Sequence, residues 1–169
     1  METTTTTQSI ELFITALVGQ NYSPKTLRAY SDDLKQFMQR VGENRVDWDN
    51  PRRFTRGDIE GFMSYLAGQN MTGVTRVRKL AAIRKLFTFM VENRIIDGNP
   101  ANAVKGARRE EKEPGILYKE QYKALLYEAS DHPRDYAIIM TFLQTGIRLS
   151  ELASLCLEDV DFENKVLTV

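Results

Sequence analysis

The stretch "YSPKTLRAYSDDLKQFMQRV", residues 22–41, has the apolar spacing of one amphipathic helix and sets the helical class of the chain. Ser23 suits the N-cap, and Pro24 suits the first helical position, where a missing N–H costs nothing. Apolar residues recur three or four positions apart and share one face: Leu27, Tyr30, Leu34, Phe37 and Val41. The opposite face is polar: Lys25, Arg28, Asp32 and Gln36. The stretch therefore predicts a helix with one buried and one solvated face.

Three further segments have the same period, and together they predict a four-helix bundle over residues 9–104. Residues 9–19 carry an apolar stripe. Residues 54–69 begin with Thr55 and Asp58 at the spacing of a capping box. Residues 72–94 form the last helix, with an apolar stripe: Val77, Leu80, Ile83, Phe87, Met90 and Val91. Lys79 and Arg84 are expected to flank that stripe. No internal repeat is expected.

Residues 97–117, "DGNPANAVKGARREEKEPGIL", combine glycine, proline and dense charge and indicate a linker over residues 105–117, after a short helical turn at residues 100–104. Residues 118–169 predict an α+β portion. A helix near residues 122–129 precedes a core helix at residues 134–144, which Gly146 can end. A short helix at residues 148–156 and a hairpin at residues 160–169 follow. Because a lone hairpin is marginal, we expect the sequence to stop within a domain.

The composition is typical of a globular protein, with 42% apolar and 27% charged residues. Residues 1–8 are expected to form a disordered tail, and the N-terminus lacks the basic and apolar regions of a signal peptide. No apolar stretch nears the ~20 residues that span a membrane. Cys156 is expected to be a reduced core thiol, which favours a cytoplasmic location. Neither a metal site nor a cofactor site is expected, and His132 is interpreted as a solvated loop residue.

Charge is distributed unevenly along the chain although its net value is zero. Residues 21–109 contain 17 Lys and Arg against 9 Asp and Glu, whereas residues 110–169 contain 6 against 12. A basic module favours a polyanionic partner such as nucleic acid. Chance clustering of charge is the alternative.

Two predicted helices carry most of the basic side chains, and helices of this kind fit the major groove of DNA. An ordinary solvated face is the alternative, because Lys and Arg are good helix formers. The candidate DNA-binding residues on these helices are Lys25, Thr26, Arg28, Thr75, Arg76, Arg78, Lys79, Arg84 and Lys85.

Arg148 and Glu151 lie three residues apart at the start of a predicted helix, in the segment "QTGIRLSEL", residues 144–152. The spacing by itself favours a surface ion pair. The apolar helix before them, and a glycine at position 146 that permits close approach, favour an arginine that binds a phosphate with both arms of its guanidinium.

The segment "TGIRLSELASLCLEDVDFENKVLTV", residues 145–169, resembles the first active-site box of the tyrosine recombinases, the phage integrase family. Upstream, "SPKTLRAYSDDLKQFMQ", "FTRGDIEGFMSYL", "GVTRVRKLAAIRKLFTFMVENRIIDGNPA" and "LYKEQYKALL" resemble that family's core-binding domain and the entry to its catalytic domain. The likeness covers residues 8–169. It implies a mainly α fold: a four-helix, SAM-like core-binding bundle followed by a truncated α+β catalytic domain of helices and a β-hairpin.

The resemblance also implies DNA integration or recombination without metal or cofactor, in which a tyrosine hydroxyl attacks the scissile phosphodiester. It assigns Arg148 the role of first catalytic arginine, which stabilises charge on the phosphorane, with Glu151 supporting it. The two domains would close on double-stranded DNA, and the linker residues Lys105, Arg108 and Arg109 would cross its backbone. The parent enzyme is expected to be a tetramer on paired sites.

The family's remaining catalytic residues, including the nucleophilic tyrosine, would follow residue 169. The tyrosines nearest the box all precede Arg148: Tyr118, Tyr122, Tyr127 and Tyr136. We therefore expect this chain to bind duplex DNA without cleaving it. One alternative is a standalone DNA-binding accessory module without catalysis, and another is an all-α protein-interaction module with solvated basic faces.

Overall fold

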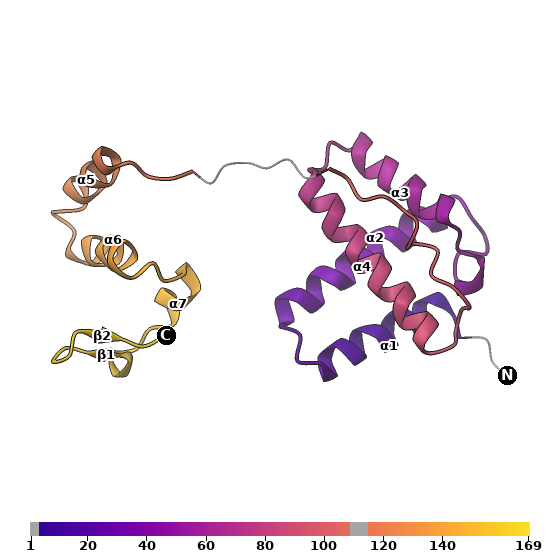
Figure 1. Cartoon of the computed structure of the whole chain (residues 1–169), viewed down its shortest axis with the longest axis horizontal. Helices are drawn as coiled ribbons and strands as arrows, with labels where there is room; N and C mark the ends of the chain where they lie inside the picture. The colour runs from indigo at the N-terminus through magenta and orange to yellow at the C-terminus, as the bar shows by residue number, and fades with distance from the viewer. Residues whose placement is uncertain (1–3, 109–114) are drawn as a thin grey trace. The chain divides into compact units, whose positions relative to one another are not determined.

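Residues 4–108 and 115–169 are described by a computed structural model of the chain, which is mainly helical (Figure 1). Two units are separate, residues 1–112 and residues 113–169, and the division falls inside the predicted linker. Each unit is described by itself. Within the described residues, no helix has the length and apolar character needed to cross a membrane.

The first unit contains the predicted four helices: α1 (Thr6–Gly19), α2 (Pro24–Gly42), α3 (Arg56–Gly68) and α4 (Gly73–Glu92). A single 3-10 turn, η1 (Pro51–Arg53), precedes α3. Helices α2 and α4 each pack against the other three, and Figure 1 shows them crossing in the middle of the unit. The candidate DNA-binding residues that were predicted on helices therefore lie on the two central helices of this unit.

Phe37 of α2 lies at the centre of the core and is fully buried. Its ring centroid is 5.6 Å from that of Phe54, 5.3 Å from Phe62 and 6.4 Å from Phe87. Aromatic rings at these separations, tilted or edge-on, add to the free energy gained from burial. The core of the first unit thus joins α2, α3 and α4 with the loop before α3.

The predicted helix starts are confirmed. Ser23 is the N-cap of α2 and accepts from the N–H of Thr26 at 3.2 Å, with Pro24 at the first helical position. Thr55 caps α3, and the side chain of Asp58 accepts in return from the N–H of Thr55 at 2.7 Å. Both caps satisfy backbone donors that a helix leaves unpaired at its N-terminus.

The turn from α1 to α2 and the turn from α3 to α4 have the same backbone geometry. Asn21 and Asn70 lie in these turns in the left-handed conformation, with φ of 58° and 56°. The next residue donates back to the helix in both cases, from Tyr22 to Leu17 at 3.2 Å and from Met71 to Leu66 at 3.1 Å. Asparagine tolerates this conformation better than most residues, so equivalent turns join the helices.

The predicted disordered tail is wrong for residues 6–8, because α1 begins at Thr6. The N–H of Thr6 donates to the carbonyl of Asp49 at 2.8 Å, and Thr7 donates to the Asp49 carboxylate from both its N–H and its hydroxyl. Thr6 and Ser9 are fully buried. Polar composition indicated a tail, but these polar groups find partners within the chain. Residues 1–3 lie outside the described residues.

The second unit contains α5 (Lys119–Glu128), α6 (Pro133–Thr145), α7 (Leu149–Ser154), the turn η2 (Leu157–Asp159) and the strands β1 (Val160–Asp161) and β2 (Val166–Leu167). The strands form the predicted antiparallel hairpin, with Val160 opposite Leu167. Gly146 ends α6 with a φ of 66°, as the sequence predicts.

Two expectations for the second unit are wrong. Helix α6, predicted as a core helix, packs against α5 but has no buried residue. Cys156, predicted as a core thiol, is exposed in the turn between α7 and η2. Within the described part of this unit, Ala129 is the one buried hydrophobic residue.

Candidate nucleic-acid interface

A buried carboxylate joins two of the candidate basic residues on α4. Asp33 of α2 has a side chain that is 2% exposed, and it accepts from Lys79 Nζ at 2.7 Å through Oδ1. Its other oxygen, Oδ2, accepts from the guanidinium of Arg78. The Lys79 side chain is 9% exposed, whereas the Arg78 side chain remains 45% exposed. One carboxylate therefore faces two cations, and the excess positive charge lies on the exposed Arg78.

Lys79 is more buried than the sequence predicts, which places it at the flank of the apolar stripe with a contact to DNA. It lies on the buried side of α4, close to Leu80 and Ile83 in the packed core. A buried ammonium needs a partner of opposite charge, and Asp33 supplies it. At this position the ammonium of Lys79 is bonded to Asp33 and stabilises the fold.

Arg84 and Lys85 also have partners within the chain. Arg84 donates from Nε to the carbonyl of Ala101 at 3.2 Å and from Nη2 to the carbonyl of Val104. The guanidinium of Arg84 is thus engaged within the chain, and its predicted contact with DNA stays a prediction. Lys85 donates to the hydroxyl of Tyr22, and its Nζ lies 4.3 Å from the centre of that ring. Lys85 stays half-exposed on the flank of α4.

Lys25 and Arg28 are exposed on α2, and the described residues give neither of them an ion-pair partner. Thr26 and Thr75 occupy equivalent places, three residues after the N-caps of α2 and α4. Thr26 lies within hydrogen-bond distance of the Ser23 hydroxyl at 2.8 Å, and Thr75 of the Thr72 hydroxyl at 3.0 Å. Their hydroxyls are therefore engaged in the helix caps.

Arg76 is half-buried at the start of α4, and its Nε is a buried atom with no partner among the described residues. Lys105 and Arg108 are exposed at the end of the first unit. Gly106 between them lies against Val77 and Leu80 of α4. The remaining linker candidate, Arg109, lies outside the described residues.

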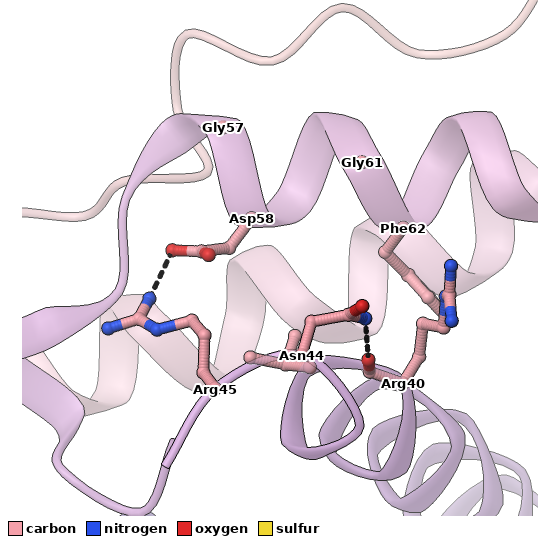
Figure 2. Close-up of a pocket in the computed structure, with 8 residues that line it drawn as sticks. Arg40, Asn44, Arg45, Gly57, Asp58, Gly61 and Phe62 are labelled. Atoms are coloured by element: carbon pink, nitrogen blue, oxygen red, sulfur yellow. Dashed lines mark hydrogen bonds and ion pairs between the residues drawn. The ribbon is translucent and has the colours of Figure 1, made fainter. Parts of the chain in front are cut away.

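A polar pocket of about 260 Å³ lies between the end of α2 and the start of α3 (Figure 2). Arg45 donates to Asp58 at 2.7 Å, and the Asn44 amide donates to the carbonyl of Arg40 at 2.9 Å. Arg40 itself pairs with Glu43 at 2.8 Å. Because both arginines of this pocket are already paired, the pocket is better explained by fold stability than by binding.

Burial by itself raises the pKa of Asp58, but three hydrogen bonds outweigh that effect. The N–H and hydroxyl of Thr55 and the guanidinium of Arg45 all stabilise the carboxylate, so the pKa of Asp58 lies below its ordinary value. Asp58 closes the cap of α3 and also anchors Arg45, which donates to the carbonyl of Arg53 at 3.1 Å.

Arg148 is the N-cap of α7, directly after the turn that Gly146 makes possible. Its backbone N–H donates to Glu151 Oε2 at 2.6 Å, and its Nη1 donates to Oε1 at 2.7 Å. The backbone hydrogen bond and then the guanidinium lower the pKa of Glu151. The Arg148 side chain is 81% exposed. The two residues are brought together as expected, whereas shielding of the arginine by the apolar helix is not observed.

Sequence reasoning missed Asp33 and Tyr22, which fix the candidate cations of α4. The available signal was an acid and an aromatic residue on or beside α2, at positions that face α4 once the helices cross. That crossing is a tertiary feature that helical periodicity does not encode.

Known proteins resemble the chain over nearly its whole length. Residues 10–94 match the phage integrase N-terminal SAM-like domain, and residues 116–169 match the phage integrase family. Tyrosine recombinase XerC of Pediococcus pentosaceus is 31% identical over 157 residues, which cover 90% of this chain and 52% of the relative. XerC of Lactobacillus delbrueckii subsp. bulgaricus is 30% identical over 167 residues, covering 94% of this chain and 55% of the relative. The chain thus spans about half the length of these curated relatives.

Two solved structures share the fold. The Tn1549 transposon integrase in complex with circular intermediate DNA aligns with a TM-score of 0.70 at 18% identity, over 94% of this chain and 52% of that protein. A lambda integrase dimer bound to a COC′ core site aligns with a TM-score of 0.75 at 15% identity, over 94% of this chain and 56% of that protein. From the matched family domains and the XerC relatives together, the chain belongs to the phage integrase family of tyrosine recombinases.

Proposed function

We propose that this chain acts in site-specific DNA recombination and that its first unit binds duplex DNA through exposed basic side chains of α2, α4 and the segment after α4. The proposed contacts are Lys25, Arg28, Arg78, Lys85, Lys105 and Arg108, all exposed or half-exposed. Lys79 and Arg84 are left out of this set because their charged groups bond within the chain. Each contact would release condensed counterions from a phosphate and so make binding depend on salt.

The observation that carries the proposal is the charge balance around Asp33. The buried Lys79 neutralises this carboxylate, so the carboxylate orients Arg78 without cancelling its charge. An arginine that is both anchored and half-exposed loses less side-chain freedom when it binds a phosphate. That two proteins of the same fold were solved bound to DNA supports duplex DNA as the partner.

Arg148 is proposed as the first catalytic arginine, which binds the scissile phosphate, with Glu151 as the residue that positions it. Glu151 bonds both the backbone and the guanidinium of Arg148, which leaves the other guanidinium nitrogens open to solvent and to a phosphate. Further copies of the protein would complete a tetramer on paired sites. The tyrosines of α5 and α6 and of their flanking residues precede Arg148, so the 169 residues are proposed to bind DNA without attacking it.

A nicked suicide duplex tests both parts of the proposal. We expect the 169-residue chain to shift a labelled duplex at low salt and to form no covalent adduct that survives denaturing electrophoresis. Absence of binding at low salt would contradict the proposal and favour a protein-interaction module. A covalent adduct would show that a tyrosine among these residues is a nucleophile.

A further inference from the structure

Arg84 is turned away from solvent and towards the chain that leaves α4. Its guanidinium donates to the carbonyl of Ala101 at 3.2 Å and to the carbonyl of Val104. A planar guanidinium with several donors can hold two acceptors at once, which an ammonium cannot do with the same geometry. Arg84 therefore links the middle of α4 to residues 17 and 20 positions later in the chain.

Asn99 makes a second link beside the first. Its amide donates to the carbonyl of Arg84 and to the hydroxyl of Thr88, both at 3.0 Å. Its side-chain oxygen accepts from the N–H of Ala101 at 2.8 Å. Ala101 is fully buried and Val104 is 2% exposed, so apolar contacts hold the same segment. Gly106 then lies against Val77 and Leu80, closer to the start of α4.

We name residues 99–106 the strap, because hydrogen bonds and burial hold them along α4. Glycine, proline and charge indicate a linker over residues 105–117, yet the chain stays on α4 through residue 106. Lys105 lies within the strap and Arg108 lies two residues beyond it, and both are exposed. The backbone that carries Lys105 and leads to Arg108 is therefore held beside α4, the helix that carries Arg78.

We propose that Arg84 is a positioning residue: it holds the strap on α4, so that Lys105 and Arg108 meet the DNA backbone from a fixed place beside that helix. This inference rests on the proposed function for its DNA partner, while the strap itself can be tested without DNA. Fixing the two cations in advance lowers the conformational entropy lost on binding, and that raises affinity without adding a contact.

Arg84→Lys is the test variant, because it keeps the positive charge and removes the forked donor. Arg94→Asn is the matched control: it alters an exposed cation just beyond α4, and asparagine tolerates the left-handed backbone found there. In Arg84→Lys we expect faster amide exchange at Ala101 and Val104, with no change at Leu80 and Phe87. Unchanged exchange at Ala101 and Val104 would overturn the strap.

Duplex affinity tests the second half of the proposal. We expect Arg84→Lys to weaken binding about three- to tenfold, the range for loss of a pre-ordered side-chain arrangement, with an unchanged salt slope. Lys105→Ala/Arg108→Ala removes the two cations that the strap holds in place. Adding Arg84→Lys to that double variant should therefore weaken duplex binding no further.

If Arg84→Lys weakens binding as much in the double variant as in the natural sequence, Arg84 acts on DNA independently of the strap cations and the proposal is wrong. If the chain binds no duplex at all, the proposed function fails together with the DNA role of the strap. The amide-exchange result would still decide whether Arg84 holds residues 99–106.

Discussion

Asp33 of α2 and Lys79 of α4 form a buried ion pair, with 2.7 Å between Oδ1 and Nζ. The two residues are 46 positions apart, and both helices contribute to the crossing at the centre of the first unit. Arg78 bonds the second oxygen of the same carboxylate from the solvent side. A single acidic residue thus stabilises the helix crossing and orients a candidate DNA contact.

Replacing the acidic residue of this pair should lower the free energy of unfolding substantially. In Asp33→Asn the ammonium of Lys79 stays buried without a counter-charge, and such changes cost about 3–5 kcal/mol. Lys79→Met should cost less, because Asp33 keeps Arg78 as a partner. Urea unfolding followed by circular dichroism measures both, with the exposed Asp32→Asn as a control that changes stability by less than about 0.5 kcal/mol. Equal losses in the two variants at positions 33 and 79 would contradict this account.

The two left-handed asparagines should respond alike to substitution. Asn21→Ala and Asn70→Ala place a β-carbon in a conformation that disfavours it, at a cost of about 1 kcal/mol each. Asn21→Gly and Asn70→Gly should be close to neutral, since glycine adopts positive φ freely. Thermal unfolding of the four variants, beside Gln20→Ala as a neighbouring control, makes the comparison. A clear difference between the two sites would show that the two turns are not equivalent in energy.

Acid should weaken the cap of α3. The pKa of Asp58 is lowered from 3.8 in the folded chain, so its carboxylate adds stability above that value, and the contribution is lost as pH falls through the lower folded-state pKa. Asp58→Asn should therefore cost about 1 kcal/mol at neutral pH, a value reduced by partial exposure. The difference from the natural sequence should shrink progressively as pH falls below 3.8 and through the lower folded-state pKa of Asp58. Urea unfolding across this range tests the sign, and a difference that grows in acid would contradict it.

Local features of the fold could be predicted from the sequence because their causes lie within a few residues. The stripe that contains Leu34 and Phe37, the Ser23 cap and the Gly146 stop are set by side-chain spacing and backbone conformation. The same holds for the close approach of Arg148 and Glu151, which are three residues apart.

The remaining features depend on partners far away in the sequence. Lys79 lies on a basic segment, and its burial follows from a carboxylate on another helix. Arg84 looked equally available, but its acceptors are backbone carbonyls, which carry no sequence signal. Thr6 and Thr7 looked disordered because their partner, Asp49, is more than forty positions away. Apolar periodicity predicts which face of a helix is buried, but it does not predict which residues of other elements that face contacts.

The salt dependence of duplex binding tests the central claim most directly. The slope of log affinity against log salt falls by about 0.9 for each phosphate contact removed. We predict that Arg28→Ala/Arg78→Ala weakens binding and reduces this slope by about 2. Arg56→Ala, which alters an exposed cation paired with Glu60 on α3, should leave the slope unchanged. If the double variant binds with the same affinity and the same slope as the natural sequence, the exposed cations of α2 and α4 do not hold DNA.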